Sequence, residues 1–153
     1  MPRNRAVAIV IHNDKLLVMF RKNSREYYTF PGGGIEAGET TEQAVIREVM
    51  EETSLHIEAE GLAYEVHHDN DDVHYFFLCQ YISGTPSIQP GTNEYVDNIQ
   101  GKDTHIPEWL PIEAISETVL YPLEIRDKLI ADIEEGFAKQ VVKFDLKAVK
   151  QPR

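Results

Sequence analysis

The chain has 153 residues, 42% of them hydrophobic and 27% charged, which is long enough for a single domain over residues 1–153 with a core that needs no disulfide. Its net charge of −11 with neutral histidines argues against a nucleic acid polymer as partner, because a basic footprint is missing. No apolar run is long enough to cross a membrane and Cys79 is the only cysteine, so we expect a cytoplasmic protein.

The first third of the chain is expected to form strands and one helix. Two apolar runs flank Asn13 and Asp14, a pair typical of a tight hairpin turn. The stretch "YYTFPGGG" predicts a short strand that enters a glycine-rich loop. Thr40 and Gln43 have the spacing of a capping box, so we expect a helix to begin near Thr41.

The middle of the chain is expected to form strands followed by a long loop. "HIEAEGLAYEVHHDNDDVHYFFLCQYISG" predicts two or three strands, with a hairpin tip at residues 68–72 and with Cys79 packed as a small hydrophobe. The chain from Thr85 to Glu108 is rich in Pro, Gly, Asn and Asp, and we interpret it as a loop.

The last part is expected to form a helix and a late pairing segment. Apolar residues recur at near-helical spacing in "PLEIRDKLIADIEEGF", with Pro122 at the start. "VVKFDLKAV" alternates apolar and charged residues, so residues 139–153 are expected to hold a strand or an exposed tail, which would also suit a homodimer. Strands and helices mix without regular alternation, which favours the α+β class.

Three carboxylates share one face of the first helix. Glu48, Glu51 and Glu52 span about 100° of its circumference, where like charges repel. A solvated acidic face is one interpretation, but these residues adjoin the apolar stripe and follow the glycine loop "PGGGIEAGE". Glycines allow positive φ and close approach of the backbone to a ligand, and clustered oxygen ligands suit Mg²⁺ or Mn²⁺. The pattern therefore predicts a divalent cation site.

The segment Gly33 to Leu55, "GGIEAGETTEQAVIREVMEETSL", resembles the Nudix box, whose pattern is G, five residues, E, seven residues, then R-E-U-x-E-E-x-G-U with U a bulky aliphatic. The matching positions are Gly33, Glu39, Arg47, Glu48, Val49, Glu51, Glu52 and Leu55. Ser54 stands where the family has glycine. Either Ser adopts the left-handed conformation there at a cost of about 1 kcal/mol, or the turn takes another form, and we expect slight destabilisation without loss of the chemistry. "YTFPGG" and Trp109 in "EWLPIEAI" also resemble family features.

The resemblance implies an α/β/α sandwich with a mixed central sheet and a loop–helix–loop motif. It implies that Glu48, Glu51 and Glu52 bind Mg²⁺ (or Mn²⁺) with the carbonyl of Gly32, and that Arg47 and Glu39 brace the loop against the helix. Water activated by metal and a carboxylate would attack a phosphorus of a pyrophosphate. The expected activity is thus a pyrophosphohydrolase of a small nucleoside diphosphate derivative.

The general base and the substrate contacts stay open at this point. Glu48 is one candidate base, and Glu94 in "PGTNEYVD" is another unless it is an ordinary loop acid. Arg21 and Arg25 either meet phosphates or serve solubility, and Tyr28 either stacks on a base or packs in the core.

Two further features have competing interpretations. The cluster of histidines and aspartates near residues 67–74 is either a second metal site or a solvated hairpin tip.

The resemblance also bears on the substrate. In the family, a proline after the box often marks hydrolases of ADP-ribose, and a tyrosine at a similar distance marks those of dinucleoside polyphosphates. Residues 56–85 contain no proline, and Tyr64 and Tyr75 are poorly placed, so a nucleoside triphosphate, including an oxidised one, is favoured. A non-catalytic nucleotide-sensing module and an acidic interaction protein are the alternative functions.

Overall fold

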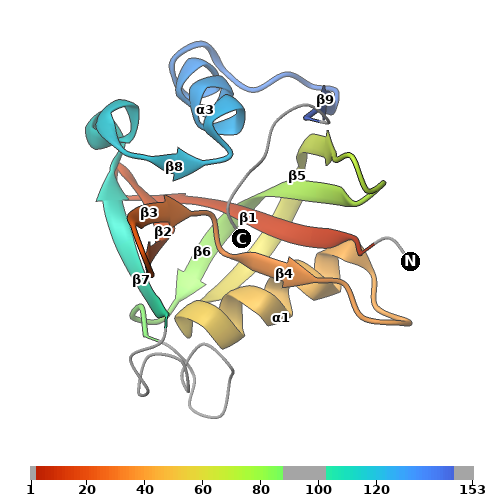
Figure 1. Ribbon diagram of the computed structural model, residues 1–153, viewed down its shortest axis with the longest axis horizontal. Coiled ribbons are helices and arrows are strands. Elements are labelled where there is room, and N and C mark those ends of the chain that lie inside the picture. Colours follow the sequence, from red (N-terminus) through yellow and green to blue (C-terminus); the bar gives the residue numbers. More distant parts are fainter. Residues whose placement is uncertain (1–2, 88–102, 147–153) are drawn as a thin grey trace.

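The computed structural model describes residues 3–87 and 103–146, which form a curled mixed sheet covered by one helix on each side (Figure 1). The helices are α1 (Thr41–Thr53) and α3 (Leu123–Glu135), with a short 3-10 helix at Ile112–Glu117. The strands are β1 (Arg5–His12), β2 (Lys15–Lys22), β3 (Glu26–Thr29), β4 (Gly32–Gly34), β5 (His56–His67), β6 (Val73–Ser83), β7 (Thr104–Pro111), β8 (Leu120–Tyr121) and β9 (Val142–Asp145). The expected α+β sandwich with a mixed central sheet is confirmed.

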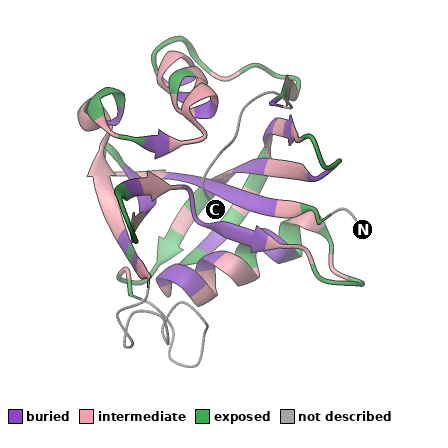
Figure 2. Cartoon of the chain, in the orientation of Figure 1, coloured by how far each residue is buried: buried purple, intermediate pink, exposed green. Residues whose placement is uncertain are grey.

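Strand β1 is the centre of the sheet and separates two cores. The strand order is β8-β3-β2-β1-β6-β5-β9, with β4 added on β1 and β7 added on β2. Side chains alternate along a strand, so Ala6 and Ala8 pack with α1 while Val7 and Ile9 pack with α3. Both faces of β1 are therefore buried (Figure 2), which explains its uninterrupted apolar run.

Several local predictions are confirmed. Asn13 and Asp14 have φ of 52° and 59°, as a tight β1–β2 turn requires. Helix α1 begins at Thr41 behind a complete capping box of Thr40 and Gln43. β5 and β6 pair antiparallel around the expected tip, and β9 pairs parallel with β5 within the part of 139–153 that the structure describes.

Two elements differ from the sequence interpretation. The loop predicted from Thr85 to Glu108 extends too far, because β7 pairs with β2 from Thr104 onward. Residues 88–102 of that segment lie outside the described residues. Strand β7 was not predicted because it contains Pro107, which cannot donate a backbone hydrogen bond. Among the described strands, β7 pairs only with β2, so it is an edge strand, where a proline is tolerated. The glycines that were expected to form a loop are themselves strand β4, paired antiparallel with β1.

Cys79 packs in the core as expected. The thiol is buried against the α1 side of the sheet, and burial raises its pKa to about 12. A thiol that stays protonated is a poor nucleophile, so Cys79 has the properties of a packing residue. None of the helices within residues 3–87 and 103–146 is long and apolar enough to cross a bilayer.

Helix α3 is attached to the sheet by a buried polar contact. The hydroxyl of Tyr64, on β5, donates to Oδ2 of Asp132 at 2.5 Å, and Lys128 lies 2.9 Å from Oδ1 of the same carboxylate. Tyr64 and Asp132 are both buried, and burial together with this bond raises the pKa of the tyrosine. The contact therefore fixes where α3 lies along β5.

Replacing Tyr64 by Phe should lower the free energy of unfolding by about 2 kcal/mol, because a buried carboxylate loses a charge-assisted hydrogen bond. Urea denaturation of Tyr64→Phe measures this loss, and Tyr75→Phe on β6 is the matched control, expected to change stability by less than about 0.5 kcal/mol. Equal effects of the two substitutions would show that the contact with Asp132 does not contribute.

Candidate metal and phosphate site

Helix α1 carries the candidate carboxylates at the edge of its buried face. Val45 and Val49 are fully buried against the sheet, as their position beside the acidic arc predicts. Glu52 is only 8% exposed, while the side chains of Glu48 and Glu51 are 14% and 43% exposed. The acidic face is therefore directed toward a neighbouring element and only partly toward solvent.

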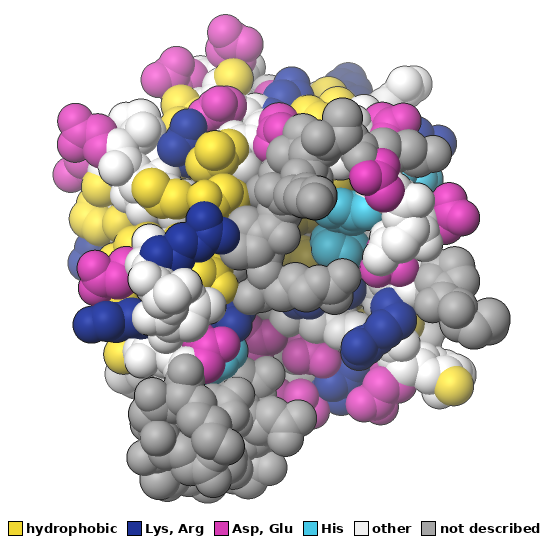
Figure 3. Space-filling view, viewed as in Figure 1, with side chains coloured by type: hydrophobic (Ala, Val, Ile, Leu, Met, Phe, Trp, Pro, Cys, Tyr) yellow, Lys and Arg dark blue, Asp and Glu magenta, His cyan; other side chains and the backbone are white. Residues whose placement is uncertain are grey.

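That neighbouring element is the glycine strand β4. Its inner edge pairs with β1, and its outer edge meets site side chains. The amide of Gly32 donates to Oε1 of Glu52 at 3.3 Å, and its carbonyl accepts from Nη2 of Arg5 at 3.2 Å. The carbonyl of Gly34 accepts from Nη2 of Arg47 at 2.9 Å. Figure 3 shows acidic and basic side chains next to one another over the region of α1 and β4.

The glycines of β4 are needed for space. A Cβ on Gly33 would lie 2.3 Å from Cδ of Glu48, so the carboxylate occupies the place of a side chain. A Cβ on Gly32 would lie 2.5 Å from the carbonyl oxygen of Ala6. The glycines were expected to allow close approach of the backbone and positive φ. Close approach is what Gly32 and Gly33 provide, whereas positive φ occurs at Gly38 in the following turn.

Arg47 joins the carboxylates to the loop. Its Nε and Nη2 donate to the two oxygens of Glu39 at 2.7 and 3.0 Å, a bidentate contact. Its Nη1 donates to Glu48 at 2.9 Å and to both oxygens of Glu51 at 3.3 Å. The hydrogen bond from Arg47 lowers the pKa of Glu39, and the carboxylate of Glu39, ahead of the other partners, raises the pKa of the guanidinium.

The donor set fits a magnesium-type ion held with help from water and phosphate. Within the described residues no three His, Cys, Asp or Glu side chains form a ready-made metal cage. Mg²⁺ is normally bound by only one or two carboxylates plus waters and substrate phosphates. Glu48 and Glu51 converge on one nitrogen of Arg47, and Glu52 contacts the adjacent strand, so hard oxygen atoms are gathered beside the cradle at Gly33.

The candidate substrate residues lie on β2 and β3 and in the turn between them. Arg21 forms an ion pair with Asp103 at 3.1 Å. The guanidinium of Arg25 lies 5.5 and 5.6 Å from the ring centres of Tyr27 and Tyr121, within cation–π distance. Glu94 lies outside the described residues, so its role as a base stays a prediction.

Tyr28 faces the opposite side of the sheet from Arg21, because Tyr28 pairs with Phe20 and side chains alternate. It packs against the core on the α3 side, and its ring lies 5.3 Å from that of Phe20. Burial and a hydrogen bond to Glu108 raise the pKa of its hydroxyl. This position agrees with the packing interpretation of Tyr28, and contact with a base stays a prediction.

Ser54 adopts the left-handed conformation that the family glycine would have. Its φ is 65°, and its amide closes α1 on the carbonyl of Met50 at 2.9 Å. Its hydroxyl donates to the carbonyl of Ser87 at 2.7 Å and accepts from the Ser87 hydroxyl at 2.9 Å. These bonds offset part of the strain of the left-handed conformation.

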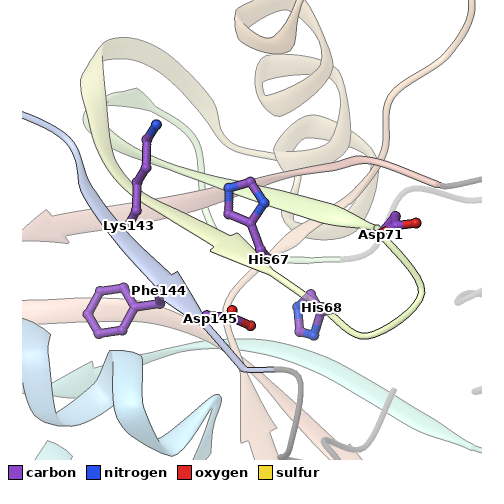
Figure 4. A pocket seen from close by; sticks show the side chains of 6 residues that line it. All are labelled: His67, His68, Asp71, Lys143, Phe144 and Asp145. Carbon is purple, nitrogen blue, oxygen red and sulfur yellow. The ribbon is translucent and has the colours of Figure 1, made fainter.

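The histidine cluster forms a hairpin tip with a small adjoining pocket. His67 lies 2.9 Å from Glu65, and Nε2 of His68 lies 3.2 Å from Nδ1 of His74. The pocket has a volume of about 260 Å³ and is lined by residues of the tip and of β9 (Figure 4). Among the described residues, no three His, Cys, Asp or Glu side chains lie together here that could bind a metal ion.

Arg5 is the described site residue that the sequence interpretation missed. It begins β1, and its guanidinium reaches the carbonyl of Gly32 beside Glu52. A single arginine at the start of a strand has no spacing pattern that would indicate this contact. The pairing of β1 with β4 creates it, and that pairing depends on the glycines being a strand.

A family model for the NUDIX domain matches residues 2–132. Among curated relatives, an ADP-ribose pyrophosphatase of Methanocaldococcus jannaschii is 45% identical over 49 residues, which cover 31% of this chain and 29% of that protein. A protein of Bacillus subtilis named as a putative 8-oxo-dGTP diphosphatase is 28% identical over 89 residues, covering 57% of this chain and 58% of its own length. These matches thus span less than two thirds of each relative.

The fold also resembles solved structures. The crystal structure of an ADP-ribose pyrophosphatase from Streptococcus suis superposes with a TM-score of 0.66, covering 95% of this chain and 99% of that one. At 17% identity this likeness establishes a shared fold.

The three glycines of β4 should respond differently to replacement by alanine. Gly32→Ala forces a Cβ into the backbone of β1 and should cost about 2 kcal/mol or more of stability. Gly33→Ala meets the movable end of Glu48, so it should displace the carboxylate at a smaller cost. Gly34→Ala, which approaches only Arg3, should change stability by less than about 0.5 kcal/mol and serves as the control. Urea unfolding of the three variants measures the order, and equal losses would contradict it.

Proposed function

The chain belongs to the NUDIX family, and on this premise we propose that it is a Mg²⁺-dependent pyrophosphohydrolase that cleaves a small nucleoside diphosphate derivative. The observation that carries the proposal is the convergence of Glu48 and Glu51 on Arg47, beside Glu52 and a strand of glycines. The carboxylates of Glu36, Glu39, Glu48 and Glu51 all lie within 4 Å of the one guanidinium of Arg47, so negative charge is in excess there. A divalent ion that binds a diphosphate offsets that excess.

Glu48, Glu51 and Glu52 would hold the metal, with the carbonyl of Gly32 as a further oxygen ligand. The bound ion supplies charge neutralisation for the phosphoryl oxygens and a lowered pKa for a ligand water. Arg47 holds Glu48 and Glu51 in place through Nη1, and Glu39 holds Arg47 through the bidentate contact. This support costs the site no reorganisation when substrate arrives.

A carboxylate must accept the proton of the attacking water. Glu48 is our candidate within the described residues, because its carboxylate occupies the cradle at Gly33 at the centre of the cluster. Glu94 is the second candidate. Arg21 and Arg25 stay candidates for phosphate contacts.

For the substrate class, we propose a nucleoside triphosphate, an oxidised one included. The lack of proline in residues 56–85 supports this choice, as does the likeness to the relative named as a putative 8-oxo-dGTP diphosphatase. ADP-ribose is the second candidate, favoured by the relative of 45% identity. The single cysteine still favours a reducing compartment, and a homodimer stays a prediction.

A nucleotide-sensing module without turnover is the alternative function. The retained acids of the motif favour the enzyme, because a sensor needs no activated water. A third interpretation, an acidic interaction protein, leaves the contact of Glu52 with the glycine strand without a purpose.

Glu52→Gln should lower turnover by about two orders of magnitude or more, because it removes one charged ligand of the metal from a nearly buried position. The measurement is phosphate and pyrophosphate release with Mg²⁺ across a panel of ADP-ribose, nucleoside triphosphates and 8-oxo-dGTP. Glu58→Gln, an exposed acid of β5, is the control and should retain full activity.

The panel also separates the alternatives. Release from any member of the panel by the unaltered chain, abolished in Glu52→Gln, supports the enzyme. Binding of nucleotide without release would identify a sensor, and neither binding nor release would contradict the proposed function.

A further inference from the structure

Gly32 of β4 contacts two charged side chains: Glu52 on the acidic face of α1, and Arg5 at the start of β1. Gly32 donates its amide hydrogen to Glu52 and accepts a hydrogen bond from Nη2 of Arg5 on its carbonyl oxygen. One glycine thus separates a nearly buried carboxylate from a positively charged group. The guanidinium of Arg3 lies close by, since a Cβ on Gly34 would be 3.3 Å from it.

Arg5 forms no ion pair with an acid of the described residues. Its side-chain hydrogen bond goes to a neutral carbonyl, and within residues 3–87 and 103–146 it has no carboxylate partner. Buried charged side chains are normally paired, and this chain has 26 acidic residues against 15 Lys and Arg. By contrast, Arg47 and Arg21 both form ion pairs. A guanidinium without an ion pair, next to a proposed polyphosphate site, is suited to bind the phosphate.

A cation on the Gly32 carbonyl would disfavour Arg5 in its present position. Two positive charges at one oxygen repel, so the guanidinium gains by turning to the oxygen atoms of a diphosphate. Its planar donors match phosphate oxygens in a bidentate contact, which an ammonium group does not.

We propose that Arg5 is a substrate-binding residue, which rests on the Gly32 carbonyl in the ligand-free chain and binds the diphosphate of the substrate. The proposal rests on the proposed function of this site. If the proposal holds, removing the charge of Arg5 affects the two ligands differently. The diphosphate binds more weakly, whereas the metal ion alone binds with the same or higher affinity. A residue that only braced β4 against β1 would weaken both when replaced.

The test measures two dissociation constants without turnover. Electron paramagnetic resonance follows free Mn²⁺ during titration of the chain, and calorimetry follows imidodiphosphate, a diphosphate that is not hydrolysed, at saturating Mn²⁺. Arg5→Gln should weaken imidodiphosphate binding about tenfold or more, as expected for loss of a charge-assisted hydrogen bond. Its affinity for Mn²⁺ alone should equal or exceed that of the unaltered chain.

Arg126→Gln is the matched control. Arg126 also donates to a backbone carbonyl, that of Thr118 at 3.0 Å, but it does so from α3 on the opposite side of the sheet. This substitution removes the same charge and the same kind of bond, together with an exposed ion pair to Asp127 at 2.9 Å. Both dissociation constants should stay unchanged. Arg5→Lys, which keeps the charge, should retain Mn²⁺ affinity and lose less diphosphate affinity than Arg5→Gln; if the Gln variant does not fold, Arg5→Lys must still bind imidodiphosphate about threefold more weakly.

Unchanged imidodiphosphate binding in Arg5→Gln, or a parallel loss of Mn²⁺ and imidodiphosphate, would overturn the role of Arg5. Failure of the unaltered chain to bind imidodiphosphate at all would instead contradict the proposed function. The two failures are therefore distinguishable.

Discussion

The arrangement of the site depends on the contact between one guanidinium and three carboxylates. Arg47 uses all three of its nitrogens, on Glu39, Glu48 and Glu51 and on the carbonyl of Gly34. Without it, Glu48 and Glu51 would repel one another on the same helical face. The contact also ties the loop that precedes α1 to the helix, so a single residue joins the carboxylates to both the loop and the glycine strand.

The glycine strand β4 makes room for the site because it has no side chains. Because Gly33 has no side chain, the carboxylate of Glu48 lies against the backbone of β4, and the outer edge of that strand meets Glu52, Arg5 and Arg47. Strand β1 holds β4 from the other side and is itself fixed by buried residues on both faces. The precision of the site therefore comes from the core of the sheet.

Much of this arrangement was predictable from local signals. The spacing of Glu48, Glu51 and Glu52 identified one helical face, and Thr40 with Gln43 identified its start. Two strands escaped prediction because their composition is typical of loops: β4 consists of glycines, and β7 contains Pro107. The contact of Arg5 with Gly32 was equally hidden, since it joins residues 27 positions apart and depends on the pairing of two strands.

The most direct test of the account is a Mn²⁺ titration of the unaltered chain and of Glu48→Gln. Binding is measured as the decrease in the electron paramagnetic resonance signal of free Mn²⁺. The account predicts saturable binding that weakens about tenfold or more when this one carboxylate is neutralised, while an exposed acid such as Glu58 has no effect when replaced by Gln. Binding of equal strength in all three chains, or no saturable binding in any, would contradict the claim that the acidic face of α1 is a cation site.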